Sequence, residues 1–459
     1  MTLTLIPPRF TPPLEPDFRP PILANRAFRQ AVAEAGGGEM LVFGLERAED
    51  DISRFETQVF PSNHPRASEN LTYAERLLKF LLWQRGAWRV YVGGPPAIGQ
   101  YLQTVYSLQG ERAFDVQFMG EKAYLHPFTV VPCSVADVPP AHESSRTLGR
   151  HLQGYRIGFD LGASDIKVSA VVDGRAVYSN EIVWEPVQQH DPRYHYEHIR
   201  AALHEAAAHM PRVDAIGGSS AGVYVDNQPR VASLFRSIPP ERFGEIRDMF
   251  RRLADEFGVP LVVVNDGEVT ALAGSMSLED NGVLGIAMGS SEAAGYVNMQ
   301  GSITGWLNEL AFAPVDYNTA APVDEWSGDR GVGALYFSQQ CVFRLAPKVG
   351  IDPVGETKAA RLKSVQAQLE AGHEGARQIW QSIGAYLGYT LAHYAEFYDL
   401  KHVLILGRVT SGSGGPLILE TAREVLKAEF PELAQLNIQL PDEKSRRVGQ
   451  AIAAASLPD

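Results

Sequence analysis

The segment Tyr155–Ala170, YRIGFDLGASDIKVSA, decides how the larger part of the chain is interpreted. Residues 156–159 alternate toward a core, a run of small residues follows, and 166–172 is apolar again, which predicts a strand, a turn and a second strand. An acidic residue at a strand end, here Asp160, can hold a hydrated metal ion, and a small-residue turn lets backbone N–H groups approach phosphate oxygens. An ordinary β-hairpin explains the same pattern, so this segment alone leaves both interpretations open.

The composition is typical of a soluble globular protein. The chain has 459 residues, 45% of them hydrophobic and 21% charged, and such a length predicts about three units of roughly 150 residues each. No stretch reaches the roughly 18 apolar residues of a membrane span, and Met1–Ala24 does not resemble a signal peptide. Cys133 and Cys341 lie far apart, which favours a cytoplasmic location. The net charge of −13 argues against general nucleic-acid binding.

Prolines and polar stretches divide the chain. Residues 1–24 carry many prolines, and because proline lacks an N–H and fixes φ, this arm is expected to lie extended on the surface or on a partner subunit. Residues 25–150 predict an α/β or α+β module of unknown role, with a helix at about 72–85 and a strand at 114–118. A polar, proline-bearing stretch places its boundary near 135–153.

Three later segments repeat the arrangement of the opening one. Residues 261–268 and 284–295 are each an apolar strand that ends in a loop of small and acidic residues. Residues 403–412 form a strand and a glycine turn after a long helical region, although any strand–helix loop explains that turn as well. Ligands gather at loops beyond strand ends in layered α/β folds, so the ordered set predicts a ligand site better than each segment does.

The acidic residues of these loops suit phosphoryl transfer to an alcohol. That reaction needs a carboxylate to take the hydroxyl proton, together with donors and a divalent ion at the γ-phosphate. Asp266 at a strand end can be the base, Asn265 can orient a hydroxyl, and Glu309 can accept hydrogen bonds from further hydroxyls. Two simpler interpretations remain. Asn265-Asp266-Gly267 is also a turn that caps the helix beginning near Glu268, and Glu309 is also a solvated loop carboxylate.

Over about residues 155–459 the chain resembles the sugar-kinase branch of the actin/hexokinase/heat-shock ATPase superfamily, most closely the bacterial ROK-type glucokinases (repressor, open reading frame, kinase). The segment 160–164, DLGAS, is similar to the family's first phosphate motif, Asp-x-Gly-Gly-Thr. This resemblance implies that Asp160 faces Mg²⁺ through water. It also implies that ATP phosphates contact Gly162, Ala163 and Ser164.

Three further matches support the resemblance. Asn265-Asp266 resembles the family's Asn-Asp pair, in which the aspartate is the general base. The segment 308–312, NELAF, is similar to the sugar-binding Gly-Glu-Ile-Gly-His, which implies a sugar contact for Glu309. Residues 289–295 resemble the second phosphate loop, and 406–409 the adenosine-binding turn. The nucleotide-binding residues implied by these two segments are Gly289, Ser290, Ser291, Gly407 and Arg408.

The resemblance implies an α/β fold of two ribonuclease-H-like lobes with a ligand cleft between them, preceded by the additional N-terminal domain. The first kinase-like lobe is expected at 151–280 and the second, with the nucleotide site, at 281–459. The implied activity is ATP-dependent phosphorylation of a hydroxyl on a sugar or related polyol, with ATP and Mg²⁺ as cofactors. A homodimer is expected, because the arm suits a contact between subunits.

Several residues depart from the family's pattern. Asp165 stands where Lys or Asn is common, and Glu292 would repel a γ-phosphate unless it binds a cation or turns away. Phe312 replaces the family's histidine. Residues 310–350 offer no more than Cys341 for the family's zinc cluster, so structural zinc is not expected. These departures favour an alternative, a non-catalytic sensor or scaffold that binds a sugar or nucleotide without transfer.

Overall fold

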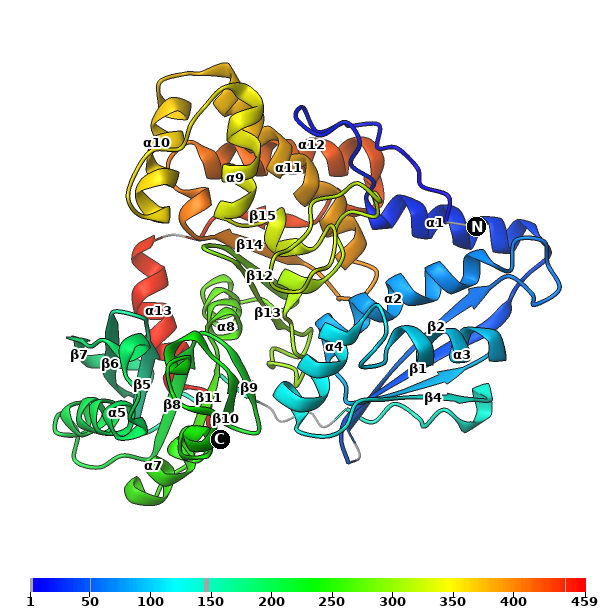
Figure 1. The fold of residues 1–459 in the computed structure, drawn as a ribbon. Helices are drawn as coiled ribbons and strands as arrows, with labels where there is room; N and C mark the ends of the chain where they lie inside the picture. Colours follow the sequence, from blue (N-terminus) through cyan, green and yellow to red (C-terminus); the bar gives the residue numbers. More distant parts are fainter. Residues whose placement is uncertain (1–2, 50, 144–147, 442) are drawn as a thin grey trace. The chain divides into compact units, whose positions relative to one another are not determined.

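The computed structural model describes residues 3–49, 51–143, 148–441 and 443–459 (Figure 1). The chain folds into two compact units, and each unit is assembled from three separate stretches of sequence. Unit 1 comprises residues 1–144, 286–294 and 305–440, and unit 2 comprises residues 145–285, 295–304 and 441–459. No helix among the described residues is both long and apolar enough to cross a membrane.

The first part of unit 1 is a four-stranded sheet with helices. Its elements are α1 (Pro21–Glu34), β1 (Glu39–Ala48), β2 (Asp51–Val59), α2 (Glu69–Arg85), β3 (Arg89–Gly93), α3 (Pro96–Val105), α4 (Ala113–Gln117) and β4 (Thr129–Cys133). The strand order is β2-β1-β3-β4, with β1 antiparallel to both neighbours and β3 parallel to β4. Residues 113–117 are helical, so the expected strand at 114–118 is wrong. The helix brings Asp115 to Lys79 and to the indole N–H of Trp83, at 2.7 and 2.8 Å.

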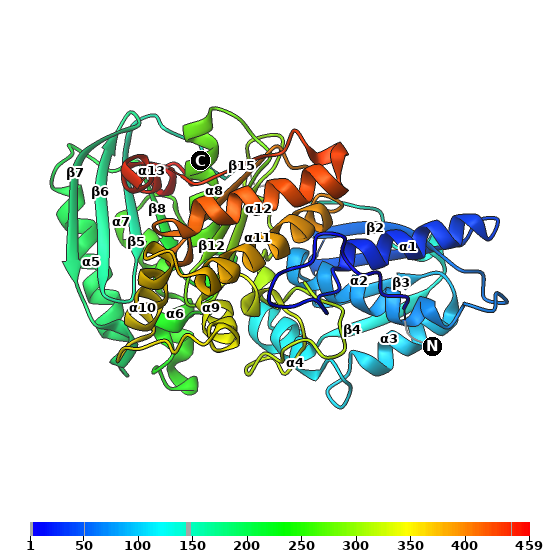
Figure 2. The ribbon, with the colours of Figure 1, turned by 90° about the horizontal axis from the view of Figure 1, so that it is seen from above.

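The second part of unit 1 contains a sheet of strand order β13-β12-β14-β15. Its elements are β12 (Val283–Met288), β13 (Glu292–Val297), α9 (Gln339–Leu345), α10 (Lys358–Glu370), α11 (Glu374–Tyr394), β14 (His402–Leu406), α12 (Gly414–Glu429) and β15 (Asn437–Gln439). The first residues of β12 and the last of β13 belong to unit 2. Figure 2 shows α11 and α12 side by side, and α11 is almost entirely buried.

The proline-rich arm packs on its own chain. The N–H of Phe10 donates to the carboxylate of Glu429 on α12, and the N–H of Leu14 donates to the hydroxyl of Ser382 on α11. Phe18 is buried against Tyr386, with ring centroids 4.9 Å apart. Main-chain donors and the buried ring of Phe18 therefore hold the arm on unit 1.

Unit 2 is a five-stranded mixed sheet with helices. Its elements are β5 (Tyr155–Leu161), β6 (Asp165–Val172), β7 (Arg175–Val183), α5 (Pro192–Ala207), β8 (Ala215–Ser220), β9 (Val223–Val225), β10 (Gln228–Val231), α6 (Phe243–Arg247), α7 (Met249–Phe257), β11 (Leu261–Asn265), α8 (Asp266–Leu278) and α13 (Glu443–Ala455). The strand order is β11-β8-β5-β6-β7, in which β5, β8 and β11 are parallel and β6 and β7 are antiparallel. β9 and β10 form a separate ribbon.

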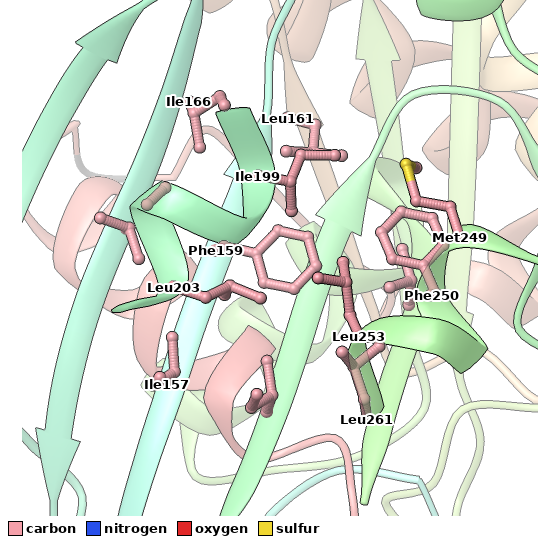
Figure 3. Packing of buried hydrophobic residues seen from close by; sticks show 14 of the residues in the cluster. Ile157, Phe159, Leu161, Ile166, Ile199, Leu203, Met249, Phe250, Leu253 and Leu261 are labelled. Carbon is pink, nitrogen blue, oxygen red and sulfur yellow. The ribbon is translucent and has the colours of Figure 1, made fainter. Parts of the chain in front are cut away.

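The two faces of this sheet are covered differently. Alternate residues of β5, among them Phe159 and Leu161, pack with α5 and α7 in the core (Figure 3). On the other face, α13 contacts β5 and β8 and also packs against α8. A Cβ at Gly217 of β8 would overlap the carbonyl oxygen of Ala454, so glycine allows α13 to approach this closely. Asp160 lies two residues from Gly158, whose Cα also faces α13, and it therefore emerges on that face.

Candidate functional site

Asp160, Asn265 and Asp266 gather at the carboxyl edge of the parallel strands of unit 2. In the register of β5 and β8, Asp160 lies opposite Ser219, and in that of β8 and β11, Asn265 lies opposite Ser220. Because β8 is the strand between the other two, Asp160 and Asn265 differ by one residue in height along the sheet. Asp266 follows as the first residue of α8. The edge thus collects two carboxylates and an amide.

The two carboxylates influence each other. Burial, and then the negative charge of Asp160, raise the pKa of Asp266 to about 6, although the N–H of Gly267 donates to its carboxylate. Burial also raises the pKa of Asp160, while a hydrogen bond from Ser219 and the charge of Lys167 act in the opposite direction. The side chain of Asp160 is 31% exposed, so it retains access to solvent. Of the two, Asp266 has the pKa of a base poised for use near neutral pH.

Asn265 caps the helix that carries Asp266. Its Oδ1 accepts from the N–H of Gly267 at 2.7 Å, and its Nδ2 donates to the carbonyl of Gly222 at 2.7 Å. The capping interpretation that the sequence offered therefore describes these contacts. An amide oxygen has two lone pairs and an amide nitrogen two hydrogens, so the cap leaves one of each for a hydroxyl. Asn265 fixes the start of α8 and hence the position of Asp266.

The first turn, residues 162–164, is held from its sides. The N–H of Gly162 donates to the carbonyl of Asp165 at 2.9 Å. The indole N–H of Trp184 donates to the carbonyl of Gly162 at 2.8 Å. The main-chain N–H of Trp184 donates to the carbonyl of Ser164 at 3.1 Å. Ala163 and Ser164 are exposed. The tip of the turn therefore faces solvent on a fixed frame, as an anion-binding turn requires.

Lys167 offsets the extra negative charge of Asp165. Its ammonium nitrogen lies 3.3 Å from Asp165 and 3.9 Å from Asp160. The side chain of Asp165 also accepts a hydrogen bond from Ser164 at 2.8 Å. The sequence contains a signal for this role of Lys167, because residues two apart on a strand share a face and a hairpin at 155–172 pairs Lys167 with Asp160.

In unit 1 the second loop and the glycine turn lie together. Residues 289–291 join β12 to β13. Gly407 follows β14 with φ of +102°, and a Cβ there would lie 2.5 Å from the carbonyl oxygen of Met288, the residue that precedes the loop. Glycine is required at this position for both reasons. The exposed Arg408 follows directly. This part of unit 1 thus presents Ser290, Ser291 and a cationic side chain at one sheet edge.

Glu292 points into unit 1 and away from the tip of its loop. The residue is 3% exposed, whereas Ser290 and Ser291 are exposed. Burial, and then the negative charge of Glu309, raise its pKa to about 8. Neither of its carboxylate oxygens has a hydrogen-bond partner among the described residues. A phosphate at the loop tip is therefore not opposed by an exposed Glu292 side chain.

The N-terminal module positions Glu309. The N–H groups of Asn308 and Glu309 donate at 2.9 Å to the carbonyls of Gln84 and Trp83, which are among the last of helix α2. These carbonyls have no partner within a helix, so the segment serves as a cap. Phe312 packs on the indole of Trp83 with ring centroids 4.5 Å apart. The place of the family's histidine is thus filled by an aromatic contact with the module, which no local sequence signal indicated.

The residues present fit a hydrated divalent cation. Among the described residues, no three His, Cys, Asp or Glu side chains converge as metal ligands. Mg²⁺ keeps several of its waters and is commonly bound through one or two carboxylates together with substrate phosphates. Asp160, which is partly exposed beside the first turn, suits this mode.

Comparisons with known proteins identify the fold. No protein-family model matches the chain, and no curated protein matches its sequence. A ROK hexokinase from Thermus thermophilus matches with a TM-score of 0.52 and 20% identity, over 65% of this chain and 97% of the other. A ROK family transcriptional regulator, a homologue of the E. coli MLC protein, matches with a TM-score of 0.52 and 16% identity, over 67% and 79%. The resemblance indicated by the motifs is thereby confirmed at the level of the fold.

Proposed function

We propose that this protein transfers the γ-phosphoryl group of ATP to a hydroxyl of a sugar or related polyol, with Asp266 as general base. The observation that supports it most is the pair of carboxylates at the edge of β5, β8 and β11, in which Asp266 has a pKa of about 6. Such a carboxylate is ionised at neutral pH and still basic enough to accept a proton as the hydroxyl attacks.

Each group then has a defined task. The hydroxyl oxygen forms a bond to the γ-phosphorus, its proton passes to Asp266, and the bond from that phosphorus to the bridging oxygen of ADP breaks. In unit 2, Asn265 orients the hydroxyl that Asp266 deprotonates. In unit 1, Glu309 is proposed to accept hydrogen bonds from a sugar hydroxyl. Asp160 would hold Mg²⁺ through water, and the bound ion would supply positive charge at the phosphates. The turn at 162–164 of unit 2 is suited to approach phosphate oxygens through its backbone.

The nucleotide is proposed to bind at the edge of the other sheet, in unit 1. Gly289, Ser290 and Ser291 contact its phosphates. Gly407 and Arg408 hold the remainder of the nucleotide, because the missing side chain of Gly407 lets this turn lie directly against Met288 beside the loop, and Arg408 is exposed there.

A non-catalytic sensor or scaffold is the second candidate. It is favoured by the replacement of the family's glycine-rich second loop by a sequence containing Glu292. A protein of this kind would bind a sugar or a nucleotide, and the carboxylate pair would have no proton to accept.

The direct test is transfer of label from γ-³²P-ATP to a panel of hexoses and polyols in the presence of Mg²⁺. A labelled sugar phosphate is expected for at least one member, together with a rise in Tm with Mg·ATP. Release of inorganic phosphate without sugar serves as the control. Binding of a sugar without any response to nucleotide would instead establish the second candidate.

The pH dependence of the transfer tests the assignment of the base. Asp266 must be ionised to accept the proton, so kcat/KM is expected to fall as pH falls through about 6 and to level off above about 7. The fall approaches tenfold per pH unit below that value, because a single protonation removes the base. A profile that is flat between about pH 5 and about pH 8 would exclude Asp266 as the titrating base.

A further inference from the structure

A group of polar atoms buried inside unit 1 is not used by phosphoryl transfer. Neither carboxylate oxygen of Glu292 has a hydrogen-bond partner among the described residues, and the same holds for the hydroxyl of Tyr394 and the Nδ2 of Asn308. All three residues are at least 97% buried. Buried polar groups are paired in nearly all native proteins. Other buried polar atoms of unit 1 also have no partner among the described residues, but these four belong to residues that act on one another, which points to a shared missing group.

These atoms belong to one neighbourhood. The charge of Glu309 acts on Glu292, and the charge of Glu292 acts in turn on Tyr394. Asn308 precedes Glu309 and accepts a hydrogen bond from the hydroxyl of Tyr398 at 2.9 Å. Tyr398 in turn acts on Tyr394. Two acidic side chains and two tyrosines thus line the same part of unit 1.

The position of the Glu292 carboxylate is fixed by packing. A Cβ at Gly333 would overlap one of its oxygens, so only a glycine at that position leaves room for the carboxylate. An acid that is held so closely against glycine, beside a second acid, keeps its proton, as its raised pKa indicates, unless a positive charge accompanies it and stabilises the carboxylate. The missing group is therefore expected to be a cation with several donors.

We infer that the substrate of the proposed transfer carries an ammonium group, as amino sugars and aminocyclitols do, and that this group binds between Glu292 and Glu309. The inference rests on the proposed function, because Glu309 is placed there at the sugar. An ammonium group brings one positive charge and three N–H donors, enough for both oxygens of Glu292 and one of Glu309. A hydroxyl brings a single donor and no charge, and a divalent metal ion would find only these two carboxylates among the described acidic, His and Cys side chains.

The test compares amino sugars with their neutral counterparts. Glucosamine, galactosamine and mannosamine are titrated calorimetrically against the full chain, and glucose, galactose and mannose serve as the matched neutral probes. At least one amine is expected to bind about 10- to 100-fold more tightly than its counterpart, the range of a charge-assisted hydrogen bond. If no amine binds more tightly than the neutral sugar, the inference is overturned.

Two variants localise the effect. Glu292→Gln keeps the size of the side chain and removes its charge, so the preference for the amine is expected to fall toward one. Glu374→Gln removes the same charge from an exposed position of unit 1 and is expected to keep the preference. A preference that survives in Glu292→Gln would overturn the assignment.

The outcomes also separate this inference from the proposed function. Phosphorylation of glucose and glucosamine with equal kcat/KM would leave the proposed function in place and remove the inference. Tight, Glu292-dependent binding of an amine without any transfer would support the ammonium site and remove the proposed kinase activity.

Discussion

The Asp266→Asn variant is expected to lower kcat for phosphoryl transfer by about 10²- to 10⁴-fold, the usual contribution of a general base. Asparagine has the same shape as aspartate and can retain the contact with the N–H of Gly267, but its amide cannot accept the proton of the hydroxyl. The sugar is expected to bind to the variant with nearly the same Kd, because Asn265 is unchanged.

The stability of the same variant distinguishes loss of the base from loss of the fold. Burial, and then the negative charge of Asp160, raise the pKa of Asp266 to about 6, so removal of this charge is expected to leave Tm unchanged or slightly higher. Asp255→Asn, which removes an exposed carboxylate on α7 of the same unit, is the control and is expected to change kcat by less than about threefold, within the small effects usual away from the reacting atoms. Near-normal turnover in Asp266→Asn would show that another group accepts the proton.

The second large effect is expected from Lys79 in helix α2. Lys79 is 1% exposed and lies 2.7 Å from Asp115 and 3.0 Å from Asp329. The network around it contains as many positive as negative side chains: Glu75, Arg76, Lys79, Arg112, Asp115 and Asp329. Lys79→Met would leave the two aspartates buried without their shared cation, which costs about 3–5 kcal/mol of the free energy of unfolding.

Urea unfolding followed by circular dichroism measures this loss. Lys358→Met, at the exposed first position of α10, is the matched control and is expected to change stability by less than about 0.5 kcal/mol. Adding Asp115→Asn to Lys79→Met removes one of the stranded charges and is expected to recover part of the loss. A stability of Lys79→Met equal to that of the control would show that the network contributes nothing to the fold.

Local sequence signals were sufficient to predict that Asp160, Asn265 and Asp266 lie at the ends of strands in unit 2. An apolar strand that ends in Asp160, and another that ends in Asn265 and Asp266, are features of a few adjacent residues, and parallel pairing brings such strand ends together. The strand at 155–161 and the turn after it were therefore predictable. The cap formed by Asn265 was also predictable, as the alternative interpretation of the same residues.

Long-range packing decided the features that the sequence did not indicate. Apolar and polar residues alternate over 114–118, which suggests a strand. The segment is nevertheless helical, and Asp115 accepts hydrogen bonds from Lys79 and Trp83 of another helix. The inward direction of Glu292 depends on Gly333, far away in the chain. The lobes expected at 151–280 and 281–459 are each one continuous stretch of sequence, whereas each compact unit of the structure combines three separate stretches. Contacts between distant segments leave no trace in local periodicity.

Helix α13 bears on the order in which the protein takes shape during synthesis. Its backbone fills the space that Gly158 and Gly217 leave on one face of the sheet of unit 2, yet about half of unit 1 is translated between that sheet and α13. Until α13 emerges from the ribosome, strands β5 and β8 have one face without this cover. Uncovered sheet faces of this kind attract chaperones and invite association between nascent chains. The folding of unit 2 is therefore completed late, after the last residues of unit 1 have been synthesised.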